Sequence, residues 1–293
     1  MDSNKQYNIL RPMRYWWLYF LISLTVIIPG IYSLLQFGLK PGIDFTGGSI
    51  IVWDLIASED DLKSYAQESN IIIRDIDSQG TIWTITTDPV SKIDYQTFKS
   101  KFPETQELTF DTVGPALGAE LLQKTLSAII LASTLILLYI AYRFRSIKFG
   151  VSAILAMLHD SLVLLGIFSI LGYYFGVEVD TLFVTALLTI LSFSVHDTIV
   201  VYDRIRELKK KHGYLDFEEI VNRAVVETMG RSINNSLTII FMLLAMYLLG
   251  GETTKWFIFA LLVGTISGTY SSTFTAAPLL ILWDYLAKKK NKQ

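Results

Sequence analysis

Residues 147–171 read IKFGVSAILAMLHDSLVLLGIFSIL, and this stretch decides the fold class. A helix that crosses a bilayer needs about 20 predominantly apolar residues. The stretch meets that requirement, and two ionisable residues, His159 and Asp160, lie near its middle. It therefore predicts a membrane span that carries a polar doublet at depth.

Five further stretches on either side have the same character. The chain of 293 residues is 52% hydrophobic and only 18% charged, which is too apolar for an ordinary water-soluble domain. No small-residue cleavage site follows the first stretch, so we expect it to remain as a span. The sequence predicts an α-helical polytopic membrane protein with six transmembrane helices. The predicted spans are residues 15–37, 124–142, 147–171, 181–202, 232–250 and 256–284.

Positive charge is concentrated in alternate loops. Lys and Arg precede the first span and follow the second, fourth and sixth spans, the last in a basic C-terminal tail. The opposite loops are poor in positive charge: Gly172–Asp180 has none and Gly250–Lys255 has only Lys255. Because Lys and Arg favour the cytoplasmic side, we expect a bacterial (inner) membrane protein with both termini in the cytoplasm. An even number of spans also requires both termini to lie on the same side.

Three regions follow from this topology: residues 1–37 with the first span, an exported domain at 38–114, and a bundle at 115–293. Short apolar runs alternate with helical patterns in the exported domain, in the order βαββαβ. This order predicts a small α+β, ferredoxin-like fold. In the bundle region, DFEE at 216–219 is typical of a helix start. It predicts a helix near 216–230 that lies along the cytoplasmic face and continues into the fifth span.

The fourth and fifth spans contain the strongest candidates for chemistry. Asp197 lies about 10 Å inside the cytoplasmic end of the fourth span, counted from Arg204 at 1.5 Å per residue. Arg231 begins the fifth span at a comparable depth, and Asn234 and Asn235 follow it as candidate hydrogen-bonding members of a proton relay. Since the two spans are antiparallel, we expect Asp197 and Arg231 to meet. Such a pair can gain and lose a proton as the helices close and part.

Two other interpretations remain open for these ionisable residues. A static buried ion pair that fixes helix register would also explain Asp197 and Arg231. His159 and Asp160 either extend a proton relay toward Asp197 or make a satisfied contact between helices. A metal-dependent hydrolase is disfavoured, because adjacent residues on a helix point about 100° apart and each His-Asp doublet offers one ligand at best.

Glycines mark two further places. Gly42, Asp44, Gly47 and Gly48 belong to GIDFTGG after the first span, which we interpret as a hinge between membrane and domain. In the sixth span, Gly264 and Gly268 form a GxxxG pattern within a small, polar run. That pattern predicts close helix packing.

Four motifs together resemble the SecF family of protein-export membrane proteins, within the SecD/SecF group of the RND superfamily. They are GIDFTGG at 42–48, HDTIVVYDRIRE at 196–207, RSINNSLT at 231–238 and FALLVGTISGTYSS at 259–272. The resemblance covers almost the whole chain in the right order. It implies a non-enzymatic subunit that uses the proton motive force, or sodium in some lineages, to promote polypeptide export, and it implies no cofactor.

The resemblance also implies partners and site residues. A six-span member pairs with a separate SecD chain and works beside the SecYEG channel with SecA, with YajC-type and YidC-type accessory proteins as further partners. The family's proton-coupling Asp and Arg correspond to Asp197 and Arg231. His196 stands where many members carry Asn, so we expect it to tune or join the proton step. No nucleic acid is implied as a ligand.

Two other functions are compatible with the residues alone. A half-size RND-type exporter of small molecules or lipids would need a deep apolar pocket in its exported domain. A purely structural scaffold would tolerate replacement of Asp197 and Arg231 by a neutral hydrogen-bonded pair.

Overall fold

The computed structural model describes residues 11–144 and 146–290, and six helices in that part are long and apolar enough to cross a membrane. The prediction of six spans is confirmed. The first span joins a short 3-10 helix to α1 (Trp16–Gln36), and the sixth joins α9 (Glu252–Ser271), a π-helix η2 (Ser272–Ala276) and α10 (Ala277–Lys290). The other four are α5 (Pro115–Phe144), α6 (Ile147–Phe175), α7 (Thr181–Lys211) and α8 (Phe217–Leu249).

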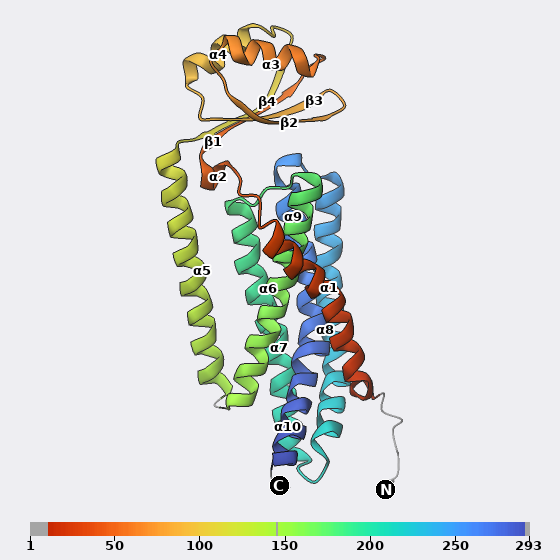
Figure 1. The fold of residues 1–293 in the computed structure, drawn as a ribbon. Coiled ribbons are helices and arrows are strands. Elements are labelled where there is room, and N and C mark those ends of the chain that lie inside the picture. Colours follow the sequence, from red (N-terminus) through yellow and green to blue (C-terminus); the bar gives the residue numbers. More distant parts are fainter. Residues whose placement is uncertain (1–10, 145, 291–293) are drawn as a thin grey trace. The chain divides into compact units, whose positions relative to one another are not determined.

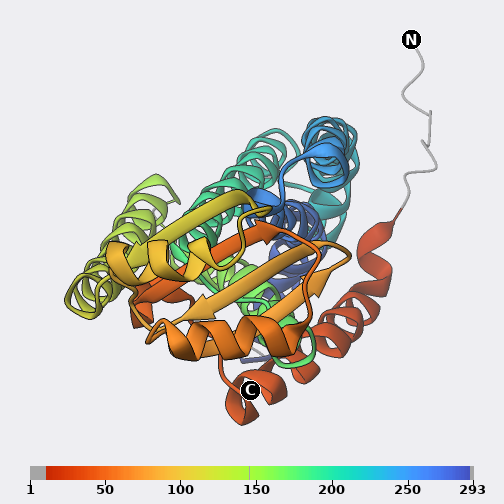
Figure 2. The same ribbon diagram turned by 90° about the horizontal axis from the view of Figure 1, so that it is seen from above.

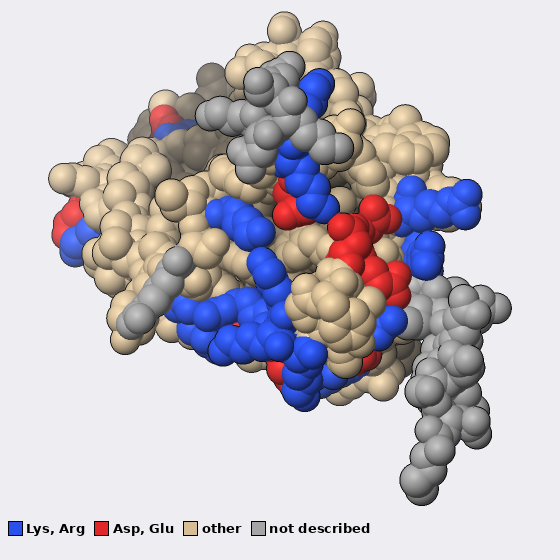
Figure 3. All heavy atoms as spheres, turned by 90° about the horizontal axis from the view of Figure 1, so that it is seen from below, with Lys and Arg blue, Asp and Glu red and all other residues tan. Residues whose placement is uncertain are grey.

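The chain forms two compact units, and the first of them is the helix bundle, residues 11–40, 129–144, 146–177 and 182–290. Its helices run roughly side by side (Figure 1). The start of the first span and the end of the sixth lie at the same end of the bundle. There the Met13 amide donates to Asn222 Oδ1 at 3.0 Å, and Lys288 Nζ donates to Asp216 Oδ1 at 2.9 Å. Lys and Arg side chains gather on this end (Figure 3).

Helix α8 corrects one detail of the sequence analysis. A helix does begin after Asp216, whose side chain caps it, and does continue into the fifth span. However, it is one unbroken helix of 33 residues, about 50 Å long, and no separate surface helix precedes the span. The reason is that its first turns bury Ile220, Val221 and Val225 in the same apolar core as Tyr202. The apolar face predicted for the membrane surface is used inside the bundle instead.

The second unit, residues 41–128 and 178–181, is built around a four-stranded antiparallel sheet. The strands are β1 (Gly48–Asp54), β2 (Ile73–Gln79), β3 (Ile82–Thr87) and β4 (Gln106–Val113), in the order β2-β3-β1-β4. Helices α3 (Glu59–Glu68) and α4 (Lys92–Ser100) cover one face of the sheet (Figure 2). Trp53 and Phe98 stack in the core between them, with ring centroids 4.9 Å apart. The prediction of a ferredoxin-like domain between the first two spans is confirmed.

Candidate functional site

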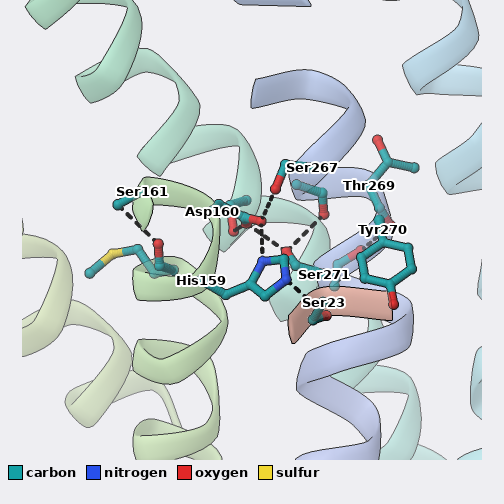
Figure 4. Close-up of polar contacts among 12 residues, drawn as sticks. Ser23, His159, Asp160, Ser161, Ser267, Thr269, Tyr270 and Ser271 are labelled. Atoms are coloured by element: carbon teal, nitrogen blue, oxygen red, sulfur yellow. Dashed lines mark hydrogen bonds and ion pairs between the residues drawn. The ribbon is translucent and has the colours of Figure 1, made fainter. Parts of the chain in front are cut away.

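Asp160, on α6, lies inside the bundle with none of its surface exposed. Its carboxylate accepts a hydrogen bond from Ser194 Oγ on α7 at 2.5 Å. It also accepts from Ser267 and Ser271 Oγ on α9, at 2.6 and 2.5 Å (Figure 4). His159 Nδ1 lies 3.0 Å from the same group. A carboxylate offers about four lone-pair positions, so this one is fully satisfied by groups from three helices.

His159 extends the cluster to the first span. The imidazole is 8% exposed, and its Nε2 lies 3.0 Å from Ser23 Oγ on α1. Its ring centroid lies 6.1 Å from that of Tyr270, whose hydroxyl donates to the Tyr19 carbonyl at 2.7 Å. The His159–Asp160 centre therefore connects α1, α6, α7 and α9 at one level of the bundle.

The charge balance of this centre determines what it can do. In the part of the chain that the structure describes, His159 is the only basic group within ion-pair distance of Asp160. An isolated carboxylate inside a bilayer is costly, and the cost falls when a proton or a cation compensates its charge. Imidazole and carboxylate together are neutral when they share one added proton. The His159 imidazole is therefore the group in this centre that can compensate the charge of Asp160.

Glycines bring the contributing helices close enough for these short contacts. A Cβ atom on Gly268 would lie 3.5 Å from Ser194, and one on Gly264 would collide with the Ile190 side chain. The GxxxG pattern of the sixth span thus faces α7 beside the site. Gly30 on α1 and Gly166 on α6 make a second close approach, where a Cβ on Gly166 would lie 2.6 Å from the Gly30 Cα.

Asp197 lies one helical turn after Ser194 on α7 and is half-buried. Its Oδ2 accepts a hydrogen bond from Ser232 Oγ on α8 at 2.7 Å. The predicted approach of the fourth and fifth spans at this level is therefore present. Asp160 and Asp197 therefore lie on neighbouring levels of the same group of helices.

Arg231 does not pair with Asp197 in this structure. Among the described residues no ion pair joins them, and the Arg231 side chain is exposed. The expected buried Asp197–Arg231 pair is replaced by Asp197–Ser232, because successive residues on α8 point about 100° apart and Ser232 takes the face toward Asp197. Arg231 instead lines a polar pocket of about 500 Å³ between α7 and α8. The other lining residues are Val200, Asp203, Arg204, Glu207, Glu227 and Thr228.

The remaining predicted residues of these two spans point away from the bundle interior. His196, Asn234 and Asn235 are exposed in the isolated chain. Within the described residues, none of their side chains takes part in a hydrogen bond to the His159–Asp160 centre. Their proposed part in proton transfer stays a prediction, and it requires a partner chain that packs against these exposed side chains.

The glycine motif after the first span lies in the second unit, where its backbone is tightly placed. Gly42 precedes the short helix α2 (Ile43–Thr46), and Gly47 and Gly48 have φ angles of +70° and +145°. A Cβ on Gly48 would lie 2.7 Å from the Thr87 carbonyl oxygen. Asp44 Oδ2 accepts from the backbone N and Oγ1 of Thr181, at 3.0 and 2.6 Å, and so caps a segment far away in sequence.

Sequence reasoning missed the hydroxyl donors of the site. Ser23, Ser194, Ser267 and Ser271 lie within predicted spans, and no motif drew attention to the first two. The available signal was their spacing: Ser267 and Ser271 are four residues apart, which places them on one helix face. Which carboxylate that face meets depends on how the helices pack, and helix periodicity does not contain that information.

Comparison with known proteins places the chain among export proteins. Residues 94–285 match the family described as protein export membrane protein SecD/SecF, C-terminal, and residues 32–52 match the SecD/SecF GG motif. The protein translocase subunit SecF of Thermobaculum terrenum is 45% identical, with 93% of each chain covered. The SecF subunit of Anaerolinea thermophila is 40% identical, with 92% of each covered.

A solved structure has the same arrangement of elements. The crystal structure of SecDF, a translocon-associated membrane protein from Thermus thermophilus, superposes with a TM-score of 0.82 at 31% identity. The match covers 97% of this chain and 40% of that longer chain.

Proposed function

This chain belongs to the SecF family of protein translocase subunits, and from that premise we propose that it couples the proton motive force to protein export through Asp197. Family membership makes it a multi-pass membrane protein that serves protein export and is not an enzyme. The observation that carries the proton-coupling role is the position of Asp197. It is a half-buried carboxylate within a membrane helix, and its recorded hydrogen bond is to a neutral hydroxyl, that of Ser232.

The mechanism uses the two helices that carry Asp197 and Arg231. When Asp197 is protonated, it is neutral and stays on Ser232. When it loses the proton, its charge favours the approach of a cation, and Arg231 is one residue away from Ser232 on α8. Because adjacent residues on a helix point about 100° apart, a substantial rotation of α8 relative to α7, together with the length of the Arg231 side chain, exchanges one partner for the other. Protonation then shifts a two-state equilibrium between helix arrangements, which gives proton passage a mechanical consequence.

A separate SecD chain is the first partner in this proposal. The SecDF protein of Thermus thermophilus contains a stretch 32% identical to this chain that occupies 38% of its length. A second half of similar architecture would face the exposed Arg231, Asn234 and Asn235 side chains at membrane depth. SecYEG with SecA, accessory proteins of the YajC and YidC types, and the exported unfolded polypeptide complete the proposed set of partners.

We also place the chain in the bacterial inner membrane, with both termini in the cytoplasm. The basic end of the bundle supports this orientation, because Lys and Arg favour the cytoplasmic side. The domain formed by β1–β4 is then exported. Its apolar side chains pack into a closed core around Trp53. A small-molecule exporter would instead need a deep apolar pocket in this domain, and the apolar side chains of the described residues are used in the core.

The test compares Asp197→Asn with the wild type in vesicles that also contain the SecD chain and SecYEG. Asn keeps the size and the hydrogen bond to Ser232 but cannot carry a proton as a carboxylate does. We expect normal assembly and loss of the stimulation of export by a proton gradient. Asp284→Asn is the matched control, because Asp284 pairs with Lys288 at the end of the sixth span, away from Asp197. Full stimulation in Asp197→Asn would rule out the coupling role.

A further inference from the structure

Three helices each direct buried polar side chains toward one line inside the bundle. On α7 they are Ser194, Thr198 and Tyr202, at intervals of four residues, and all are at most 1% exposed. The spacing of four keeps them on one helix face. Helix α6 and the α9–η2 segment repeat the pattern. We call the whole set the polar column: Ser152 and Asp160 on α6; Ser194, Thr198 and Tyr202 on α7; Ser267, Ser271 and Thr275 on α9–η2.

One end of the polar column is the His159–Asp160 centre, where Ser194 meets Asp160. Ser267 and Ser271 reach the same carboxylate (Figure 4). The other end is Tyr202. The Tyr202 hydroxyl donates to the Ala276 carbonyl of η2 at 3.1 Å and lies within hydrogen-bonding reach of Ser152. Beyond it, Phe144 and Phe149 pack edge-on against the Tyr202 ring, with centroids 5.4 and 5.1 Å away. This aromatic cluster lies at the end of the column that is nearer the basic end of the bundle.

Two hydroxyls between these ends have no protein partner. Thr198 Oγ1 and Thr275 Oγ1 are buried, and no described residue offers either of them a hydrogen bond. Thr198 is 1% exposed and Thr275 is 5% exposed. A buried polar group of this kind is uncommon in native proteins and generally indicates a bound water or ion. Both hydroxyls belong to the column: Thr198 lies between Ser194 and Tyr202 on α7, and Thr275 follows Ser271 by four residues, so a water beside either of them would lie among polar side chains.

The irregular backbone of the sixth span supports the same assignment. The π-helix η2 begins immediately after Ser271 and contains both Thr275 and Ala276. Single π-turns inside α-helices are rare and are frequent at functional sites. Here the turn contributes the Ala276 carbonyl to Tyr202 and the Thr275 hydroxyl to the column. On α6, Ala156 lies midway between Ser152 and Asp160 and is fully buried. Its side chain is small, so α6 contributes little side-chain volume to the column at that level.

We propose that the polar column holds water beside Thr198 and Thr275 and conducts protons between Tyr202 and Asp160. Each hydroxyl or water accepts a proton from one neighbour and passes its own to the next, so no bond other than O–H is made or broken. The groups that face Asp160 are His159 on α6 and the serines of α7 and α9, with the Tyr270 ring of α9 beside His159. The proposal rests on the proposed function, because it supplies a route by which protons reach the interior of the bundle.

The first experiment detects the water and does not depend on export. Short X-ray pulses generate hydroxyl radicals from bound water, and mass spectrometry then locates the oxidised side chains. Tyr202 and Phe168 are both fully buried aromatic residues of the bundle, and Phe168 packs among Phe183 and Phe259. We expect Tyr202 to be oxidised several-fold more than Phe168 in the wild-type protein. Equal, background oxidation of the two would show a dry column and overturn the proposal.

Variants then assign the water to the two threonines. Val has nearly the shape of Thr without its hydroxyl, so Thr198→Val with Thr275→Val should reduce Tyr202 oxidation several-fold. Thr189→Val on the same helix is the control, because the Thr189 hydroxyl already donates to the Thr185 carbonyl at 2.7 Å. Oxidation of Tyr202 that is unchanged in the double variant would contradict the assignment. If the double variant fails to fold, each single variant is tested in the same way.

The last measurement concerns proton conduction. The double variant should lose most of the stimulation of export by a proton gradient, while Thr189→Val keeps it. Full stimulation in the double variant would overturn the conducting role even if the water is found. The proposed function would fail in a different experiment: Asp197→Asn would then keep full stimulation of export by a proton gradient. That result would not change the oxidation of Tyr202, so the two failures can be told apart.

Discussion

Asp160 shows at the scale of one residue how a membrane bundle accommodates a carboxylate. Its two oxygens take three serine hydroxyls and one imidazole nitrogen, all from groups that would themselves be unsatisfied in an apolar core. Hydrogen bonds to an ionised acceptor are about twice as strong as neutral ones. The site is therefore a point of cohesion between helices as well as a candidate proton site.

Asp160→Asn should lower the stability of the bundle by about 1–3 kcal/mol, because the amide keeps one acceptor oxygen and leaves at least one buried donor unsatisfied. The measurement is thermal unfolding of the purified protein in detergent. Asp284→Asn serves as control, since Asp284 makes a more exposed pair with Lys288 that is worth about 1 kcal/mol or less. An equal loss of stability in the two variants would contradict the account given for Asp160.

At the scale of whole helices, α1 and α6 are held together by close backbone packing. Gly30 and Gly166 face each other with no space for a side chain, and Ser33 and Ser169 hydrogen-bond beside them at 2.8 Å. Without a hydrophobic force between helices in lipid, such close backbone packing supplies much of their association. The same crossing brings Ser23 to His159.

Gly166→Ala should destabilise the α1–α6 contact by about 1–3 kcal/mol, because the new methyl group overlaps the Gly30 backbone. Gly150→Ala on the same helix is the matched control. A Cβ at Gly150 meets no atom within 4 Å, so that variant should be neutral, or more stable by up to about 1 kcal/mol because of its helix propensity. Detergent-resistance of the folded protein measures both. A Gly166→Ala protein as stable as Gly150→Ala would disprove the close packing.

In the domain formed by β1–β4, an ion pair joins α4 to β4. Hydrogen bonds from Lys99 and Tyr95 hold the pKa of Glu107 below its ordinary value of 4.5. Burial raises the pKa of Tyr95 to about 12, so its hydroxyl stays a donor throughout the physiological range. A carboxyl group with a lowered pKa stabilises the folded state above its unfolded pKa, and this contribution is lost as the pH falls through the folded value.

Glu107→Gln should therefore reduce the stability of the domain near neutral pH, and the difference from the wild type should disappear below the ordinary pKa of 4.5. Urea unfolding, followed by the fluorescence of Trp53 and Trp83 in the full chain, provides the measurement. Because the Lys99 and Glu107 side chains are 40% and 32% exposed, the effect should also weaken in high salt. A difference that is independent of pH would refute the role of the charge.

At the scale of the whole molecule, the absence of cysteine from the sequence makes the proposed topology directly testable. Single cysteines at exposed positions can be labelled from one side of the membrane with a charged maleimide. Lys92→Cys, at the start of α4 in the domain formed by β1–β4, should react in cells whose outer membrane or wall has been removed and whose inner membrane is intact. Gly213→Cys, between α7 and α8, should react only after the membrane is permeabilised. The reverse pattern would invert the assigned orientation.

The sequence by itself determined the six spans and the four-stranded domain, since both depend on the length of apolar runs and on periodicities that belong to each segment alone. It also identified the ionisable residues within the spans, because a charge in an apolar run is visible without a structure. Only the tertiary structure decided their partners. Asp160 meets Ser194, Ser267 and Ser271, and Asp197 meets Ser232 in place of Arg231. These pairings follow from the rotation and depth at which separate helices pack, and glycines distant in the chain allow the close approach of α1 to α6 and of α9 to α7.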